Sequence, residues 1–324
     1  MNNAPILVTG SHRSGTTWVG KILKTAPNVF YIHEPLTPNS ITRAVLSFDL
    51  WYTYFNPLKD YHQIERVLQK LFEGSYPISW VFHFRKKIPH TDYRNLNCIN
   101  DDKFDYKYIK WRLNTYMDSL KIRKSDSIIP LIKDPIALTA AEWLYEKWQC
   151  RNVILMRHPA AFVSSLKRLD WRFNFENFTK QPELIDRFLS TIRSEIEDPP
   201  NDPIAEASLV WKCLTMIILD YQEIYPEWIY IRHEDLSRDP MNTFEQLCSK
   251  LDLDITEKVK TEIEKTSSTR NPQDVSSDSR VHQMHRDSKA NISSWKKRLS
   301  QSEIEVVKKI TKNTADQFYS DDDW

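Results

Sequence analysis

Glycine is nearly confined to one short stretch of this chain. The 324 residues contain four glycines, whereas average usage would give roughly 23. Three of them, Gly10, Gly15 and Gly20, lie within eleven residues near the start of the sequence. A chain that avoids glycine elsewhere needs backbone freedom or a close approach of another group at this place. This stretch is therefore the first candidate for a binding site.

Two of these glycines bound a loop between a predicted strand and a predicted helix. Residues 6–9 are a continuous β-prone apolar run, and residues 16–23 have the apolar spacing of a helix. In such a unit, loop N–H groups and the positive end of the helix stabilise an anion. The loop nearly fits the phosphate-binding pattern GxxxxGK[ST], but Thr16 follows Gly15 in place of lysine, and the cation is Arg13. The sequence predicts a phosphate site here.

Five motifs, in order along the chain, are similar to those of one enzyme family. The loop motif Arg-Ser-Gly-Thr-Thr at 13–17 resembles the 5′-phosphosulfate loop of sulfotransferases that use 3′-phosphoadenosine-5′-phosphosulfate (PAPS). Arg157-His158-Pro159, with Ser165 eight positions after the arginine, resembles the family's 3′-phosphate motif. The other matching segments are His33-Glu34-Pro35-Leu36, Ile132-Lys133-Asp134-Pro135, and 231–236 with Asp239-Pro240. The resemblance covers roughly residues 5–36 and 127–252 and points to the carbohydrate and tyrosylprotein branches.

The resemblance implies PAPS as donor, 3′,5′-adenosine bisphosphate as product, and no metal requirement. Trp18 matches the position that stacks on adenine, although its helical spacing suits a core tryptophan equally. The family closes a basic segment over the nucleotide, here about 266–296, in which either Arg280 or Arg286 matches the covering arginine. The donor-binding residues implied in this way are Ser11, His12, Arg13, Ser14, Gly15, Thr16, Thr17, Trp18, Arg157, Ser165 and Arg286.

The resemblance also implies catalytic residues. Sulfuryl transfer needs a base to deprotonate the acceptor and cations to neutralise the leaving phosphate. Glu34 matches the catalytic acid of the tyrosylprotein branch, and its alternative role is an ion-pairing or helix-capping acid. Arg13 and Lys133 match the residues that stabilise the transferring group. His33 is a second candidate base, but strand alternation predicts that it points away from Glu34, and Asp134 is expected to orient Lys133 or the loop.

The segment pattern predicts an α/β fold of one domain, 1–324, with a P-loop-type parallel sheet flanked by helices on both faces. The predicted strands are 6–9, 30–33, 127–133, 152–156 and 228–232. The predicted helices are 16–26, 137–149, 159–169, 204–225 and 241–252, followed by a terminal helix at 302–316 and a solvated tail at 321–324.

A helical, aromatic-rich insertion is predicted at about 37–126, with helices near 62–73 and 104–123. Its aromatic rings would form either an acceptor pocket or the core of a helical subdomain. They are Trp51, Tyr52, Tyr54, Phe55, Tyr61, Trp80, Phe82 and Phe84.

Composition excludes several classes of protein. Forty-five Lys and Arg against 44 Asp and Glu give a net charge of +1, which argues against a nucleic-acid binder. No apolar stretch predicts a transmembrane segment, and none predicts a secretory signal. The four cysteines show no CxxC pairing, so a cytoplasmic location is expected. The oligomeric state stays open.

The acceptor expected from the resemblance is a hydroxyl on a small molecule or glycan: a carbohydrate first, then a small hydroxylated metabolite, then peptide tyrosine. The alternative function is a Mg-dependent P-loop kinase or nucleotide hydrolase, in which Asp134 would bind the metal. The missing lysine after Gly15 and the pair Arg157 and Ser165 argue against it.

Overall fold

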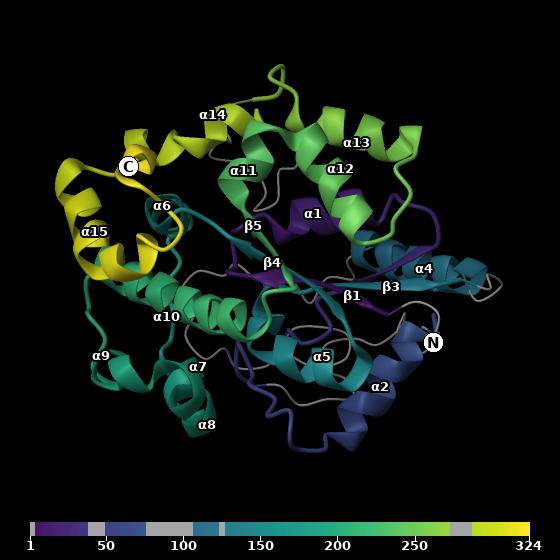
Figure 1. Cartoon of the computed structure of the whole chain (residues 1–324), viewed down its shortest axis with the longest axis horizontal. Helices are drawn as coiled ribbons and strands as arrows, with labels where there is room; N and C mark the ends of the chain where they lie inside the picture. Colours follow the sequence, from purple (N-terminus) through teal and green to yellow (C-terminus); the bar gives the residue numbers. More distant parts are fainter. Residues whose placement is uncertain (1–3, 38–48, 76–105, 123–126, 273–286) are drawn as a thin grey trace.

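Five parallel strands form one sheet in the order β2-β3-β1-β4-β5 (Figure 1). The computed structural model describes residues 4–37, 49–75, 106–122, 127–272 and 287–324. The register pairs Lys133 with Val8 on one side and with His33 on the other, so the loops after β1, β2 and β3 leave the same edge of the sheet. All five predicted strands are confirmed: β1 (Ile6–Gly10), β2 (Val29–His33), β3 (Ile129–Lys133), β4 (Arg151–Met156) and β5 (Ile229–Arg232).

Alternate residues of the buried strands face two separate cores. Ile6 and Val8 pack on one face with α1, α12 and α13, while Leu7 packs on the other with α5, α6 and α10. Figure 1 shows α1, α12 and α13 on one side of the sheet and α2, α5 and α10 on the other. Because successive side chains of a strand point to opposite faces, a sheet covered on both sides has strands that are apolar throughout. This confirms the predicted α/β class.

The helices occupy the predicted positions, with boundary shifts of a few residues. The predicted helix at 137–149 is divided into η2 and α5, and helix 159–169 has the predicted bounds. The helices and helical turns are α1 (Thr16–Leu23), α2 (His62–Phe72), α4 (Tyr106–Ile122), η2 (Pro135–Ala140), α5 (Ala141–Trp148), α6 (Pro159–Leu169), α7 (Glu176–Thr179), α8 (Pro182–Leu184), η3 (Ile185–Leu189), η4 (Ser190–Ile192), α9 (Arg193–Glu197), α10 (Pro203–Ile224), α11 (His233–Arg238), α12 (Pro240–Lys250), α13 (Glu257–Ser267), α14 (Ser288–Ile292), η5 (Ser294–Lys297), α15 (Gln301–Ala315) and η6 (Asp321–Asp323).

An Asp-Pro pair starts three of these helical segments: η2, α10 and α12. In each, the aspartate side chain accepts a backbone N–H of the first turn, from Ile136 at 3.2 Å, Ile204 at 3.0 Å and Asn242 at 3.4 Å. Proline at the first helical position has no N–H to leave unsatisfied, and its fixed φ suits the helix. The starts of these three helical segments beside the sheet therefore depend on neighbouring residues in the sequence. The pairs are Asp134-Pro135, Asp202-Pro203 and Asp239-Pro240.

Aromatic residues of the insertion contribute to the main core. Tyr52 and Phe55 are buried, and Phe55 stacks on Trp143 at a centroid distance of 4.8 Å. For these two rings the structure favours the core role over the acceptor pocket. Trp80, Phe82 and Phe84 lie outside the described residues.

The prediction of a solvated tail at 321–324 holds for Asp321 and Asp322, which are exposed, but is wrong for Asp323 and Trp324, which are half-buried. Trp324 packs edge-on against the His158 ring, with centroids 4.4 Å apart, and Asp323 accepts a hydrogen bond from Arg238 at 3.1 Å. The three consecutive acidic residues suggested solvent exposure, but arginines and aromatic rings from distant segments provide partners for this stretch.

Candidate functional site

The three clustered glycines are each required by a close approach. A Cβ on Gly10 would lie 1.9 Å from the Leu155 carbonyl oxygen, and one on Gly15 would lie 2.7 Å from Nδ1 of His233. A Cβ on Gly20 would lie 2.7 Å from Cγ of Lys133. Gly10 and Gly15 also have positive φ values of 138° and 98°, which only glycine adopts readily. The interpretation of the glycine cluster is confirmed.

The loop after β1 has the strand–loop–helix layout expected of a phosphate-binding loop. It begins with the Ser11 N–H bound to the Leu155 carbonyl at 3.1 Å, and the Ser14 hydroxyl donates to the Ser11 carbonyl at 2.6 Å. The N–H groups of Thr16 and Thr17, in the first turn of α1, have no helical carbonyl to bind. These N–H groups and the positive helix end make the loop suitable for a phosphate.

His12 lies in this loop, but its ring belongs to the aromatic core. Its Nδ1 is 2.6 Å from the Tyr52 hydroxyl, and its ring packs against Phe162 at 4.8 Å. Burial, followed by the nearby Arg13 charge, lowers the pKa of His12 to about 3. The His12 side chain is therefore neutral at physiological pH and anchors the loop to the core.

Lys133 and Glu34 form an ion pair beside the loop. Lys133 is fully buried, and its Nζ donates to Oε1 of Glu34 and to the Thr17 hydroxyl, the latter at 3.2 Å. The Glu34 side chain is 26% exposed, so a solvent-borne molecule can reach it. The ion pair joins the ends of β2 and β3 to the start of α1.

His33 lies on the same side as Glu34, so the prediction from strand alternation is wrong. Its Nε2 is 3.9 Å from Oε2 of Glu34, and its Nδ1 is 3.2 Å from the Tyr31 hydroxyl. Glu34 has a φ of 46°, in the left-handed region, where the strand and its alternation end. The turn brings the two neighbouring side chains together.

Asp134 orients the turn that follows Glu34. Its carboxylate accepts the Leu36 N–H at 2.8 Å, the Ile136 N–H at 3.2 Å and the Thr37 hydroxyl at 3.2 Å. Burial, and then the Glu34 charge, raise the pKa of Asp134 to about 7. Asp134 thus holds the turn after β2, whereas the sequence analysis expected it to orient Lys133 or the phosphate-binding loop, and its contacts argue against the metal-binding role of the kinase alternative.

Arg13, Arg157 and Ser165 come together on the opposite side of the loop. Nε of Arg13 donates to the Ser165 hydroxyl at 3.0 Å, and Nη1 of Arg157 donates to the Arg13 carbonyl at 3.1 Å. Arg157 is buried, which lowers its pKa, while the Glu234 charge acts in the opposite direction. The structure thus places the Arg13 guanidinium beside Ser165 of α6, the helix that follows β4.

Trp18 and the segment that is predicted to cover the nucleotide lie at the outer side of α1. The Trp18 indole is half-buried, donates to the Thr266 hydroxyl at 2.9 Å and packs against Phe244 at 5.5 Å. Of the segment 266–296, the structure describes 266–272 and 287–296, and Arg280 and Arg286 lie outside the described residues.

A model of the sulfotransferase family matches residues 5–257. The chain belongs to the sulfotransferase family. It is therefore an enzyme that transfers a sulfuryl group, in agreement with the motifs of its loop and strand ends. A search of curated proteins finds no match. Within the described residues, no helix is both long enough and apolar enough to cross a membrane.

Solved structures with a similar chain are also sulfotransferases. The sulfotransferase domain of the curacin biosynthetic pathway is 16% identical, with 96% of this chain and 97% of that chain covered and a TM-score of 0.49. The sulfotransferase STF9 from Mycobacterium avium is 15% identical, with coverage of 98% and 77% and a TM-score of 0.42. The sulfotransferase domain of the olefin synthase from Synechococcus PCC 7002 is 16% identical, with coverage of 95% and 95% and a TM-score of 0.46. At this level of similarity, no residue role is transferred from them.

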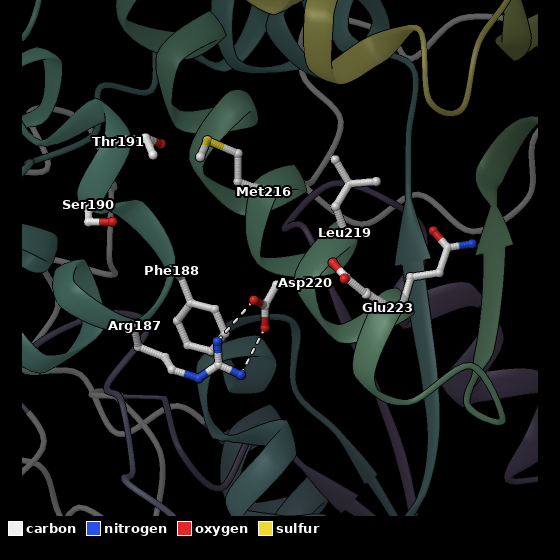
Figure 2. Close-up of a pocket in the computed structure, with 9 residues that line it drawn as sticks. Arg187, Phe188, Ser190, Thr191, Met216, Leu219, Asp220 and Glu223 are labelled. Carbon is white, nitrogen blue, oxygen red and sulfur yellow. Dashed lines mark hydrogen bonds and ion pairs between the residues drawn. The ribbon is translucent and has the colours of Figure 1, made fainter.

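The sulfotransferase also has a hollow of about 550 Å³ away from the strand ends. Figure 2 shows it between α10 and the η3–η4 segment, where Arg187 and Asp220 are joined by two contacts of 2.9 Å. None of the predicted site residues that the structure describes lines it.

Glu234 is a buried residue near the end of β4, and the sequence analysis assigned it no role. Its Oε1 accepts the His158 N–H at 3.1 Å, and its charge faces Arg157. Burial raises the pKa of Glu234, and Arg157 and these hydrogen bonds oppose that shift. The motif containing Glu234 was recognised, but only the fold brings this carboxylate to the end of β4.

Proposed function

We propose that this sulfotransferase transfers the sulfuryl group of PAPS to a hydroxyl acceptor, with Glu34 as the general base. The observation that carries the proposal is the ion pair of Glu34 with the buried Lys133, which also binds Thr17 of the phosphate loop. A base and a cation are thus adjacent at one edge of a phosphate cradle. This is the arrangement that sulfuryl transfer requires.

In the proposed step, the acceptor oxygen attacks the sulfur while its proton passes to Glu34. The S–O bond to the 5′-phosphate breaks, and its electron pair remains on the phosphate of 3′,5′-adenosine bisphosphate. Lys133 stabilises the developing charge from beside Glu34, and Arg13 does so from its position beside Ser165. No metal is needed in this scheme, since side-chain cations and loop N–H groups provide the neutralisation.

The donor would lie across the phosphate loop, with its two phosphates on opposite sides of Arg13. The loop N–H groups of 11–17 would hold the 5′-phosphosulfate, and Arg157 with Ser165 would hold the 3′-phosphate. Support comes from two contacts, one between the Arg13 guanidinium and the Ser165 hydroxyl and one between the Arg157 guanidinium and the Arg13 carbonyl. Guanidinium groups suit phosphate because they offer several fixed donors. Trp18, half-buried at the start of α1, would contact the adenine, and Arg286 would cover it.

The proposed acceptor is a carbohydrate or a small hydroxylated metabolite, and the proposed location is the cytoplasm. Both follow from the sequence resemblance and composition, and peptide tyrosine remains the third candidate. Glu34 and His33 are the partly exposed titratable groups that an acceptor would meet at the end of β2.

Ligand-dependent thermal unfolding tests the donor. A ligand present at about 100 times its dissociation constant adds about 2.7 kcal/mol to the free energy of unfolding. We expect 3′,5′-adenosine bisphosphate to raise the unfolding temperature and Mg-ATP and Mg-GTP to have no comparable effect. A shift with Mg-ATP or Mg-GTP alone would contradict the assignment of the donor.

A further inference from the structure

We propose that Tyr319 is a positioning residue of the donor site, acting through Glu234 on Arg157, and that Trp324 supports the same strand end. The proposal rests on the proposed function, because it assumes that Arg157 binds the 3′-phosphate. It concerns residues far from the phosphate loop in the sequence, of which Trp324 belongs to the tail at 321–324 that the sequence predicted to be solvated.

Glu234 is the centre of the arrangement. It is buried at the start of α11, and its two carboxylate oxygens have different donors. Oε1 accepts the backbone N–H of His158, the residue after Arg157, at 3.1 Å, and Oε2 accepts the Tyr319 hydroxyl at 3.2 Å. One carboxylate therefore connects the end of β4 to the segment after α15.

The charge of Glu234 also acts on Arg157. Arg157 is 6% exposed and Glu234 is 3% exposed, so solvent screens neither well. A buried guanidinium without a negative neighbour carries a large desolvation cost. Glu234 is the largest favourable charge on Arg157. It offsets that cost, while the bond from Nη1 of Arg157 to the Arg13 carbonyl fixes one end of the guanidinium.

The segment 318–324 is fixed by contacts from two other parts of the chain. Arg232 donates to the carbonyl of Phe318 at 2.7 Å, and Arg238 donates to Asp323 at 3.1 Å. The rings of Tyr319 and Trp324 both pack edge-on against His158, at 4.9 and 4.4 Å, and His158 also stacks on Trp295 at 5.2 Å. The segment therefore joins the strand ends of β4 and β5, and Trp295 extends the connection to the covering segment.

Removing the Tyr319 hydroxyl tests the connection with little change in volume. In Tyr319→Phe, Oε2 of Glu234 loses its donor inside the core, so the carboxylate is less well fixed at the His158 N–H, and its charge is less well placed to stabilise Arg157. We expect the affinity for 3′,5′-adenosine bisphosphate to fall about tenfold, the loss typical of one hydrogen bond to a charged group. Affinity for adenosine 5′-monophosphate, which lacks the 3′-phosphate, should change by less than about twofold.

The readout is the ratio of these two affinities, measured by titration calorimetry on the same folded protein. A general loss of stability would weaken both nucleotides together and leave the ratio unchanged. Tyr225→Phe is the matched control, because the Tyr225 hydroxyl donates to Glu142 at 3.0 Å, another tyrosine–glutamate bond. It should leave the ratio as in the unaltered protein.

Two further variants make the test decisive. Trp324→Ala should lower the ratio about threefold, the usual worth of an aromatic pair, and it substitutes for Tyr319→Phe if that variant does not fold. In an Arg157→Ala background the preference for the bisphosphate is already lost, so Tyr319→Phe should have no further effect on the ratio. An unchanged ratio in Tyr319→Phe, or in Trp324→Ala where Tyr319→Phe does not fold, or an additional drop in the Arg157→Ala background, would overturn the proposal.

The same titrations separate this inference from the proposed function. If the unaltered protein does not prefer the bisphosphate, the assignment of the donor site fails. If it prefers the bisphosphate and Tyr319→Phe keeps that preference, only the role of Tyr319 fails.

Discussion

The stem of Lys133 occupies the space that a side chain at residue 20 would need. A Cβ on Gly20 would lie 2.7 Å from Cγ and 2.9 Å from Cβ of Lys133, and 3.2 Å from a ring carbon of Tyr31. Because α1 contacts β3 this closely, the buried lysine can pass under the helix and reach Thr17 and Glu34 at the edge of the sheet. A glycine of the first motif and a lysine of a distant one are thus parts of one packing arrangement.

Gly20→Ala should therefore destabilise the protein, although alanine normally favours a helix. Overpacking of this kind costs about 1–3 kcal/mol, which exceeds the roughly 1 kcal/mol gained in helix propensity. Lys133→Ala removes the contact with Cγ at 2.7 Å but keeps the contact with Cβ at 2.9 Å, so in this background the cost of Gly20→Ala should be smaller but not zero. Denaturant unfolding of the four proteins measures both effects, and equal costs in the two backgrounds would contradict the packing explanation.

Glu34→Gln should lower turnover by about 10²–10⁴, the usual contribution of a general base. Glutamine keeps the size of the side chain but cannot take the acceptor proton, so binding of 3′,5′-adenosine bisphosphate should persist. His33→Gln is the neighbouring comparison, and a smaller loss than that of Glu34→Gln is expected. Steady-state rates and calorimetry measure these effects, and an unchanged rate in Glu34→Gln would remove this residue from the mechanism.

Arg157→Ala should weaken PAPS far more than adenosine-5′-phosphosulfate, which has no 3′-phosphate. The expected loss for PAPS is about 10- to 100-fold, from the removal of hydrogen bonds to a charged group. Arg187→Ala is a suitable control, because Arg187 pairs with Asp220 at 2.9 Å in the hollow beside α10. Competition binding gives the two affinities, and equal losses for both nucleotides would refute the 3′-phosphate assignment.

The stability of the protein should fall in acid because two histidines are buried in the neutral form. Burial lowers the pKa of His158, like that of His12, from 6.5 to about 3. The unfolded chain binds protons below pH 6.5 that the folded chain does not, so stability is complete above this pH and declines toward pH 3. At pH 5 each histidine should cost about 2 kcal/mol.

His158→Phe should remove one of these costs and keep the aromatic packing. The difference in unfolding free energy between pH 8 and pH 5 should shrink by about 2 kcal/mol relative to the unaltered protein. Asp134, whose pKa is raised to about 7 by burial, acts with the opposite sign between about pH 4 and 7 and cancels in this comparison. His62→Phe, at a side chain 78% exposed, is the control, and an equal change there would contradict the explanation.

Sulfuryl transfer should continue after removal of divalent metals. In the proposed mechanism Lys133, Arg13 and the loop N–H groups neutralise the leaving phosphate, so a chelator should change the rate by less than about twofold. The measurement is a rate with and without chelator. A loss of activity that Mg²⁺ reverses would support the kinase or hydrolase alternative instead.

The order and type of the main elements could be predicted from the sequence because their signals are local. Apolar runs indicated the strands, and three Asp-Pro pairs mark helical starts by a cap that needs only neighbouring residues. The glycine cluster indicated close approach at 10–20, since glycine was so rare elsewhere. The sulfotransferase family and its loop could be recognised for the same reason, because the motifs are short and follow one another in a fixed order.

The direction of the Glu34 side chain could not be predicted from such local signals. Alternation placed His33 and Glu34 on opposite sides, but a single positive φ of 46° at Glu34 ends the strand and brings both to one side. A backbone angle of this kind is set by the surroundings, here by Asp134 holding the turn through the N–H of Leu36 at 2.8 Å. The sequence did not reveal that contact between residues 98 positions apart.

The sequence by itself determined the parallel α/β arrangement, the phosphate loop and the family. Only the tertiary structure decided how the site residues are paired: Glu34 with Lys133, Arg13 with Ser165, and Glu234 with Tyr319. The physical reason is the distance along the chain over which each effect acts. Helix and strand propensity, capping and the backbone freedom of glycine act within a few residues. These pairs instead join remote segments, and burial sets their charge states.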